Sequence, residues 1–323
     1  METKGSFKVI IIGASVTGLT LAHCLHRAGI NYVVLEKHAE IHPPIGAAVA
    51  IMPNGARIME QPGSSITLKG SLLQSSGSIF VSRTGSTMIV FTSKDVATIT
   101  PHGAKVSVTT AAGEEFQGDL IVGADGVHSL TRREMWRVAD LEQPGRITLK
   151  EKRSMGVEFR CIFGMSNPIP GRKGWQHVIR FGPGFTILIF PAVADGLFWV
   201  LIEKLPRKYI YPDAPCFSQD KSISHCEGAA DLPIWDGVRF RDIWAHRREF
   251  RMVALEENLF RTWHHGRIVC IGDSMSKMTP NIGQEANTAM EAAAGLANML
   301  HAITQDNKLP STDTIEQALT MTT

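Results

Sequence analysis

The chain has 323 residues, which is enough for two domains or for one large domain with a smaller one inserted. Hydrophobic residues make up 44% and charged residues 20%, as in ordinary globular proteins, and the net charge of +2 argues against a nucleic-acid partner. The five cysteines show no CxxC spacing and the twelve histidines no HExxH pattern, so neither a disulfide framework nor a metal site is indicated.

Residues 7–37 form the clearest predicted unit. FKVIIIG predicts a buried parallel strand, GASVTG a turn, LTLAHCLHRAG a helix and NYVVLEK a second strand. The first apolar run stops at a glycine loop, so it fits a strand and not a signal peptide. This order is that of a βαβ unit.

The middle of the chain is predicted to be rich in strands. Residues 40–60 contain a loop and a passage from strand to helix, and residues 61–100, rich in serine and threonine, have weak β character. Residues 104–125 predict a hairpin followed by a buried strand. The longest apolar stretch, 185–202, is broken by proline, aspartate and glycine, so it predicts a β-hairpin and not a membrane span.

The last third of the chain holds one more predicted strand and a long helix. RIVCIG at 267–272 predicts a buried strand, and residues from about 284 to 303 predict a helix with an apolar face of Ala, Leu and Met. Residues 306–323 are assigned to a C-terminal tail.

The glycine loop after the first strand has the spacing of a dinucleotide-binding turn. Gly13, Ser15 and Gly18 stand in the GxGxxG frame, with serine at the second glycine position. Gly13 allows the tight turn, the small Ser15 lets a diphosphate approach the backbone, and Gly18 lets helix and strand pack closely. The start of the helix then offers free N–H groups to phosphate.

Glu36 at the end of the second strand completes this pattern. It follows Gly18 by 18 residues, where a carboxylate can accept both ribose hydroxyls of an adenosine. Loop and acid together predict dinucleotide binding, but they do not distinguish FAD from NAD.

Two later segments carry a family resemblance. GADGVHS at 123–129 and GDS at 272–274, with PNIGQ at 280–284 and Ala286-Asn287, resemble the DG and GD motifs of the class A flavoprotein monooxygenases. The sequence resembles above all the fungal FAD-dependent monooxygenases of terpenoid and meroterpenoid biosynthesis, from Val9 to about Leu300. The resemblance does not extend across residues 61–100.

The resemblance implies FAD as the cofactor. Asp273 would accept a hydrogen bond from a ribityl hydroxyl, the helix from Gln284 would direct its N-terminus at the flavin, and Asp125-Gly126 would support the floor of the site. The further residues expected to contact the cofactor are Ala50, Gly272, Pro280, Gly283, Ala286 and Asn287.

The resemblance also implies the reaction. NADPH or NADH would reduce FAD, and one atom of O2 would then reach a small hydrophobic, terpenoid-like substrate by epoxidation or hydroxylation. No side-chain nucleophile is required, and the catalytic residues stay unassigned. Arg180, before an apolar strand, is the single candidate for a side chain facing the substrate.

Three features depart from the family pattern. The segment 61–100 looks short and offers no match to the FAD-contacting arginine expected there, since Arg83 has different surroundings. Glu285 stands where the family has glycine, and its charge would disfavour anionic reduced flavin. The C-terminal helical region of the fungal relatives is not represented.

We therefore expect an α/β fold, with a Rossmann-like FAD-binding domain at 1–150 and 250–305 and an inserted β-rich substrate domain at 151–249. Two alternatives stay open: a degenerate, non-catalytic relative, and an NAD-dependent dehydrogenase, although no YxxxK motif is present. A cytoplasmic protein without a transmembrane segment is expected, and peripheral membrane association stays open.

Overall fold

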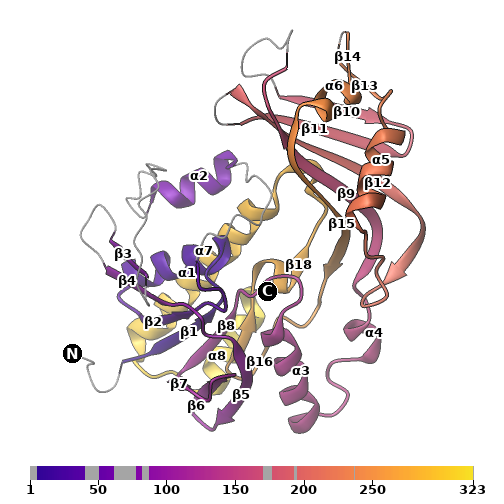
Figure 1. Cartoon of the computed structure of the whole chain (residues 1–323). Helices are drawn as coiled ribbons and strands as arrows, with labels where there is room; N and C mark the ends of the chain where they lie inside the picture. The colour runs from indigo at the N-terminus through magenta and orange to yellow at the C-terminus, as the bar shows by residue number, and fades with distance from the viewer. Residues whose placement is uncertain are drawn as a thin grey trace. The chain divides into compact units, whose positions relative to one another are not determined.

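The computed structural model describes residues 6–40, 51–61, 78–81, 87–169, 177–192, 195–235 and 237–322. Two compact units are formed (Figure 1). Unit 1 comprises Met1–Lys152, Leu259–Lys277 and Gly283–Thr323, and unit 2 comprises Arg153–Asn258 and Met278–Ile282. Arg83 and the predicted loop at 41–50, which includes Ala50, lie outside the described residues.

Unit 1 is built on a sheet with the strand order β16-β17-β8-β1-β2-β4-β3. Its five inner strands are parallel, and β16 and β3 are antiparallel to their neighbours. The bounds are β1 Lys8–Ile12, β2 Asn31–Leu35, β3 Ser78–Val81, β4 Thr87–Phe91, β8 Leu120–Gly123, β16 His264–His265 and β17 Ile268–Cys270. Parallel strands are buried on both faces, which explains why β1 and β8 are continuous apolar runs.

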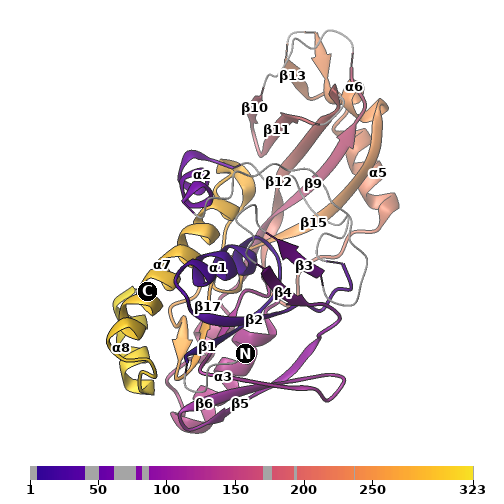
Figure 2. The ribbon, with the colours of Figure 1, turned by 90° about the vertical axis from the view of Figure 1, so that its left-hand side faces the viewer.

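Helices cover one face of this sheet (Figure 2). Val9 and Ile11 of β1 pack in one core cluster with residues of α1 (Val16–Arg27), α7 (Glu285–Asp306) and α8 (Thr312–Thr322). The predicted tail thus contains a helix, whose Ile315 and Leu319 belong to this core. The short helix α2 (Pro53–Glu60) contacts α7.

The other face is covered by a small sheet and by α3 (Leu130–Glu142). The small sheet is antiparallel and consists of β5 (Val96–His102), β6 (Lys105–Thr110) and β7 (Glu115–Gly118). Since neighbouring residues of a strand point to opposite faces, Ile10 lies on this side, where a Cβ on Gly118 would be 2.9 Å from its Cγ1. The hairpin predicted at 104–125 is therefore β6–β7, and the buried strand is β8.

Unit 2 contains the antiparallel strands β10-β11-β12-β9-β15, in that order. Their bounds are β9 Gly156–Ser166, β10 Val178–Gly182, β11 Phe185–Pro191, β12 Leu197–Ile210 and β15 Arg247–Leu259. The hairpin predicted at 185–202 is β11–β12, in which Phe185 lies opposite Glu203. Unit 2 also contains α5 Gln219–Gly228, β13 Pro233–Trp235, β14 Val238–Arg239, α6 Phe240–Ala245 and the 3-10 turn η3 Pro280–Ile282. The remaining elements of unit 1 are α4 Leu149–Lys152, β18 Ser276–Lys277 and the 3-10 turn η2 Gly272–Ser274.

The two faces of the unit 2 sheet differ in what packs on them. One face, with Ile187 and Trp199, forms a cluster with Cys226 of α5 and Trp244 of α6. The opposite face carries the second cluster, whose members come from the strands β9, β11, β12 and β15 and from Ala192 after β11; it contains Phe159, Cys161, Phe163, Met165, Leu188, Phe190, Ala192, Phe198, Val200, Ile202, Val253 and Leu255. We call this second set the apolar strand face.

In the described part of the chain, every helix is too short or too polar to cross a bilayer.

Candidate functional site: the carboxyl edge of the parallel sheet

The predicted binding residues follow the ends of four parallel strands of unit 1. Gly13 comes after β1, Glu36 after β2, Asp125 after β8 and Asp273 after β17. Because β17, β8, β1 and β2 are adjacent and parallel, these positions lie along one edge of the sheet (Figure 1). Open α/β sheets bind their ligands at this edge, where the connections from neighbouring strands diverge.

The turn after β1 and the first turn of α1 admit no side chain at Gly13 and Gly18. Gly13 has a φ of +104°, and a Cβ there would lie 2.4 Å from the carbonyl oxygen of Ala124. A Cβ on Gly18 would lie 1.9 Å from the carbonyl oxygen of Gly13. Gly13 N also donates to the Leu35 carbonyl at 2.8 Å. The turn is therefore held against β2 and β8 at a distance that only glycine permits.

The start of α1 has no side-chain cap. Ser15 is the N-cap residue, is exposed, and accepts no hydrogen bond from the first turn through its side chain. By contrast, the Ser129 hydroxyl caps α3 by accepting from Arg132 N at 2.9 Å. The first-turn N–H groups of α1 are thus left for a ligand, and phosphate is the anion that such a helix start binds well.

Glu36 is fixed beside this turn. Its side chain is buried, with Oε2 accepting from Ala14 N at 2.7 Å and Oε1 accepting from His38 N at 2.9 Å. An ionised carboxylate offers about four acceptor positions, so two of them remain for hydroxyl donors. The geometry is suited to the ribose contact that the sequence predicts.

Asp125 shapes its own loop. Its Oδ1 accepts from the Ser129 hydroxyl at 2.6 Å, and its Oδ2 accepts from the Thr131 backbone and hydroxyl at 2.9 and 3.0 Å. Gly126 follows with a φ of +78° and open space where a Cβ would be. The carboxylate therefore organises the start of α3 and the turn at Gly126.

Gly272 brings the turn after β17 against the start of α1. Its φ is +66°, and a Cβ there would lie 2.5 Å from Thr17 Oγ1. The next residue, Asp273, is half-buried and accepts from Lys277 Nζ at 2.9 Å through Oδ2. Asp273 is thus placed beyond the first turn of α1, on the side of the sheet edge away from Glu36.

The residues predicted at 280–287 serve different roles. Asn287 is fully buried, its Oδ1 accepting from Met52 N at 2.9 Å and its Nδ2 donating to the Gly283 carbonyl at 3.0 Å, so it ties α7 to the start of α2. Gly283 has a φ of +63°, and Ala286 lies half-buried in the first turn of α7. Pro280 lies in η3, which is grouped with unit 2.

Arg180 is exposed on β10. It lies opposite Ile187 of β11, and directly opposed residues of antiparallel strands point to the same face. Ile187 belongs to the cluster with α5 and α6, so Arg180 lies on that side of the sheet and not on the apolar strand face. The expectation that Arg180 faces a substrate stays a prediction.

Two residues of this edge were missed by sequence reasoning. Buried Arg132 donates to the Val127 carbonyl at 2.9 Å and to the Ser274 carbonyl, and its guanidinium lies 4.5 Å from the Phe260 ring centre. Lys277 forms ion pairs with Asp273 and with Glu285. The spacing of four residues between Asp273 and Lys277 was the one visible signal. The contacts of Arg132 with Phe260 and Ser274 join segments more than a hundred residues apart.

Cys270 lies beneath the site as a core residue. Its side chain is fully buried in β17, and burial, the largest effect, raises the pKa of its thiol. The thiol therefore stays protonated and takes no part in nucleophilic chemistry. Within the described residues, no three His, Cys, Asp or Glu side chains are grouped to hold a metal ion.

Comparison with known proteins gives a consistent result. Residues 6–70 and 79–312 match the protein family described as FAD binding domain. The chain is 65% identical to the FAD-dependent monooxygenase ctvC of Aspergillus terreus, over 99% of this chain and 75% of the relative. It is 43% identical to the FAD-dependent monooxygenase aurC of Calcarisporium arbuscula, over 94% and 70% of the two chains.

Solved structures of low sequence identity share the fold. HpxO of Klebsiella pneumoniae, complexed with FAD and uric acid, superposes with a TM-score of 0.65 and 20% identity over 93% of this chain and 81% of its own. The 2,6-dihydroxypyridine-3-hydroxylase of Arthrobacter nicotinovorans gives a TM-score of 0.68 with 14% identity over 94% and 86%. The predicted α/β fold of an FAD-binding protein is confirmed.

Proposed function

The chain belongs to the family of FAD binding domains, and we propose that it is a monooxygenase that uses NADPH or NADH and O2 to epoxidise or hydroxylate a hydrophobic, terpenoid-like metabolite. FAD-dependent monooxygenase is the activity named for its relatives of high identity. The observation that supports this most directly is the alignment of a glycine turn, an uncapped helix start and two carboxylates along one sheet edge.

The residues of this edge fit FAD. The backbone of Gly13 and Ser15 and the first turn of α1 would hold the diphosphate. The turn at Gly13 leaves no room for a Cβ, and the N–H groups at the start of α1 have no side-chain cap. Glu36 would accept the ribose hydroxyls and Asp273 a ribityl hydroxyl. The further residues proposed around the cofactor are Ala50, Asp125, Gly126, Gly272, Pro280, Gly283, Ala286 and Asn287.

When bound, FAD supplies the electron transfer and the activation of O2. The residues of the chain position it. Asp125 and Ser129 fix the turn after β8, Arg132 joins this turn to the one after β17, and Gly272 keeps the latter turn against α1. These contacts are all made within the chain, so the protein's own residues define the geometry of the edge.

The apolar strand face of unit 2 supports a hydrophobic substrate. It contains the aromatic side chains of Phe159, Phe163, Phe190 and Phe198, and its other members are Met, Leu, Ile, Val, Ala and Cys residues. Ligand sites are lined mostly by such side chains with a few polar groups. A terpenoid-like molecule, which is largely apolar, matches this chemistry better than a sugar or a nucleotide.

The non-catalytic alternative rests on the short segment 61–100 and on Glu285. Its carboxylate stands in the first turn of α7, but it forms an ion pair with Lys277. A paired carboxylate opposes an anionic ligand less than a free one, so the departure from the family pattern is partly compensated. The dehydrogenase alternative is set aside, because the matching family binds FAD.

Turnover with isotopically labelled O2 tests the proposed function. The FAD-loaded protein is incubated with NADPH or NADH and a panel of terpenoid and meroterpenoid alkenes, and products are analysed by mass spectrometry. We expect one labelled oxygen atom in the product and one nicotinamide oxidised per turnover. Nicotinamide oxidation that yields only hydrogen peroxide with every compound would contradict monooxygenation of this substrate class.

A variant pair tests the assignment of Glu36. Glu36→Gln removes the negative charge that would face the ribose, and exposed Glu40→Gln serves as the control of equal charge change. We expect Glu36→Gln to weaken FAD binding about tenfold to a hundredfold, since a hydrogen bond to a charged group is worth about 1.5–3 kcal/mol. Equal affinities of the two variants, measured by flavin fluorescence, would remove Glu36 from the site.

A further inference from the structure

Three charged side chains meet between the turn after β17 and the start of α7. Lys277 Nζ lies 2.9 Å from Asp273 Oδ2 and also forms an ion pair with Glu285. One ammonium is therefore shared by two carboxylates, which leaves the group with a net charge of −1. The Lys277 side chain is only 17% exposed, so solvent screens these charges incompletely.

The path of a bound dinucleotide leads toward this group. Glu36 marks one end of the sheet edge, the first turn of α1 lies in the middle, and Gly272 places Asp273 just beyond Thr17 of that turn. With the adenosine at Glu36 and the diphosphate at α1, the remaining half of FAD extends toward Asp273. Glu285 reaches the same place through Lys277, as the first residue of α7.

We propose that Glu285 lowers the reduction potential of the bound flavin. This inference rests on the proposed FAD site. Hydride transfer from the nicotinamide moves two electrons and one proton together, oxidises the nicotinamide and adds one negative charge to the flavin. A carboxylate near that charge opposes it. Glu285 also pairs with Lys277, which reduces the stabilisation that this ammonium gives to the negative charge of the reduced flavin.

Glu285 thereby weakens the electrostatic stabilisation that the N-terminus of a helix gives to an anion. The N-terminus of α7 favours negative charge, and its N-cap residue Gln284 makes no side-chain cap hydrogen bond. Glu285 places its own negative charge in this turn, where glycine stands in the family pattern. The variant without this charge should therefore hold the reduced cofactor more tightly relative to the oxidised one.

Potentiometric titration of the FAD-loaded protein tests this inference. Glu285→Gln is compared with the wild type and with Asp313→Asn, which removes an exposed carboxylate from the first turn of α8 in the same unit. We expect the preference of Glu285→Gln for reduced over oxidised FAD to rise about fivefold to tenfold. For a two-electron couple, tenfold corresponds to about 30 mV. Asp313→Asn should leave the potential unchanged.

A second variant gives the opposite sign. Lys277→Gln removes the shared ammonium, so the preference for reduced FAD should fall by a similar factor. If the preference for reduced over oxidised FAD stays within twofold of the wild-type value in both Glu285→Gln and Lys277→Gln, the inference is overturned while FAD binding stands. A wild-type protein that fails to bind FAD, shown by flavin fluorescence, would overturn both the inference and the proposed function.

Discussion

Gly18 and Gly295 both lie within helices, but a side chain at each would meet different surroundings. A Cβ at Gly18 in α1 would lie 1.9 Å from the Gly13 carbonyl oxygen, whereas nothing lies within 4 Å of one at Gly295 in α7. Gly18→Ala must therefore push α1 away from the turn, and we expect it to lower stability by about 1–3 kcal/mol and to weaken FAD binding. Gly295→Ala should raise stability by about 0.5–1 kcal/mol.

Denaturant unfolding and FAD titration of the two variants measure these changes. Both replacements add the same methyl group to a helical glycine, so intrinsic helix propensity favours both. Equal stability gains at Gly18 and Gly295 would show that α1 does not press against the glycine turn.

His264 makes stability depend on pH. It is buried in β16, with Nε2 3.3 Å from Thr320 Oγ1, and burial lowers its pKa, with Arg146 and His265 acting in the same direction and Glu316 against it. The unfolded chain therefore takes up the proton first, near the ordinary pKa of about 6.5. Stability is unaffected by this residue above that value and is lost as the pH falls through it toward the folded pKa.

The measurement is the free energy of unfolding at several pH values between about 7.5 and 5. We expect His264→Gln, which cannot be protonated, to lose less stability over this range than the wild type. Part of the loss should remain, because burial also lowers the pKa of His23. Parallel pH profiles for the variant and the wild type would show that His264 does not contribute.

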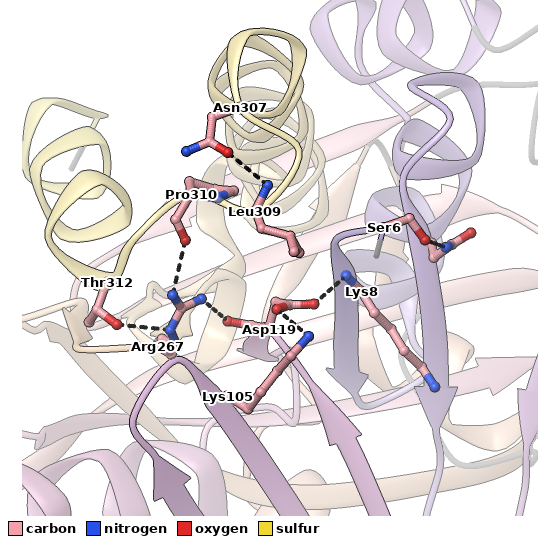
Figure 3. A network of polar contacts seen from close by, with 10 residues as sticks. Ser6, Lys8, Lys105, Asp119, Arg267, Asn307, Leu309, Pro310 and Thr312 are labelled. Carbon is pink, nitrogen blue, oxygen red and sulfur yellow. Dashed lines mark hydrogen bonds and ion pairs between the residues drawn. The ribbon is translucent and has the colours of Figure 1, made fainter. Parts of the chain in front are cut away.

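Arg267 joins α8 and the connection that precedes it to the sheet. Figure 3 shows its guanidinium between three acceptors: the Asp119 carbonyl at 2.8 Å, the Pro310 carbonyl at 3.0 Å and the Thr312 hydroxyl at 2.9 Å. Pro310 lies in the connection between α7 and α8, and Thr312 is the first residue of α8. The arginine therefore holds the α7–α8 connection and the start of α8 against Asp119, which lies between β7 and β8.

Arg267→Ala should detach this connection. It leaves buried carbonyl oxygens without a donor, so we expect a loss of about 2–4 kcal/mol. Amide hydrogen exchange in α8 should rise, since this helix would lose its anchor. Lys105→Ala is the control, because Lys105 Nζ contacts the same Asp119 at 2.6 Å but is 42% exposed. Similar losses in both variants would contradict the role given to Arg267.

The elements that the sequence predicted well are those with strong local patterns. The apolar run at 8–12, the hairpin at 185–203 and the long helix from 285 follow from periodicity and turn residues alone. Helix α3 was missed, because its apolar face is interrupted by charged residues and its start depends on the caps from Asp125 and Ser129. Helix α8 was missed because its stability comes from packing on a distant core.

The site residues likewise divide into those that a local sequence pattern predicts and those that depend on the tertiary structure. The roles of Gly13, Gly18 and Glu36 follow from spacing after a strand, since their contacts lie within one βαβ unit. The group of Asp273, Lys277 and Glu285 depends on how α7 returns to the sheet, which no local pattern gives.

At the scale of the whole molecule, the strand order explains why residues from distant parts of the chain share one edge. The inner strands β17, β8, β1, β2 and β4 are parallel, so turns after residues 12, 35, 123 and 270 open in the same direction. Between β8 and β17 the chain leaves unit 1 for residues 153–258 and then returns. Binding of FAD to the edge should stabilise the folded chain by about 2.7 kcal/mol at a hundredfold excess over its dissociation constant.

The most direct test of the FAD assignment is the amount of flavin that stays with the protein. The purified wild-type protein is incubated with FAD and passed through gel filtration, and flavin absorbance is compared with protein concentration; Gly18→Ala is treated in parallel. We expect one FAD per chain for the wild type and clearly less for Gly18→Ala. A folded wild-type protein that emerges without flavin would contradict the cofactor site and the monooxygenase function built on it.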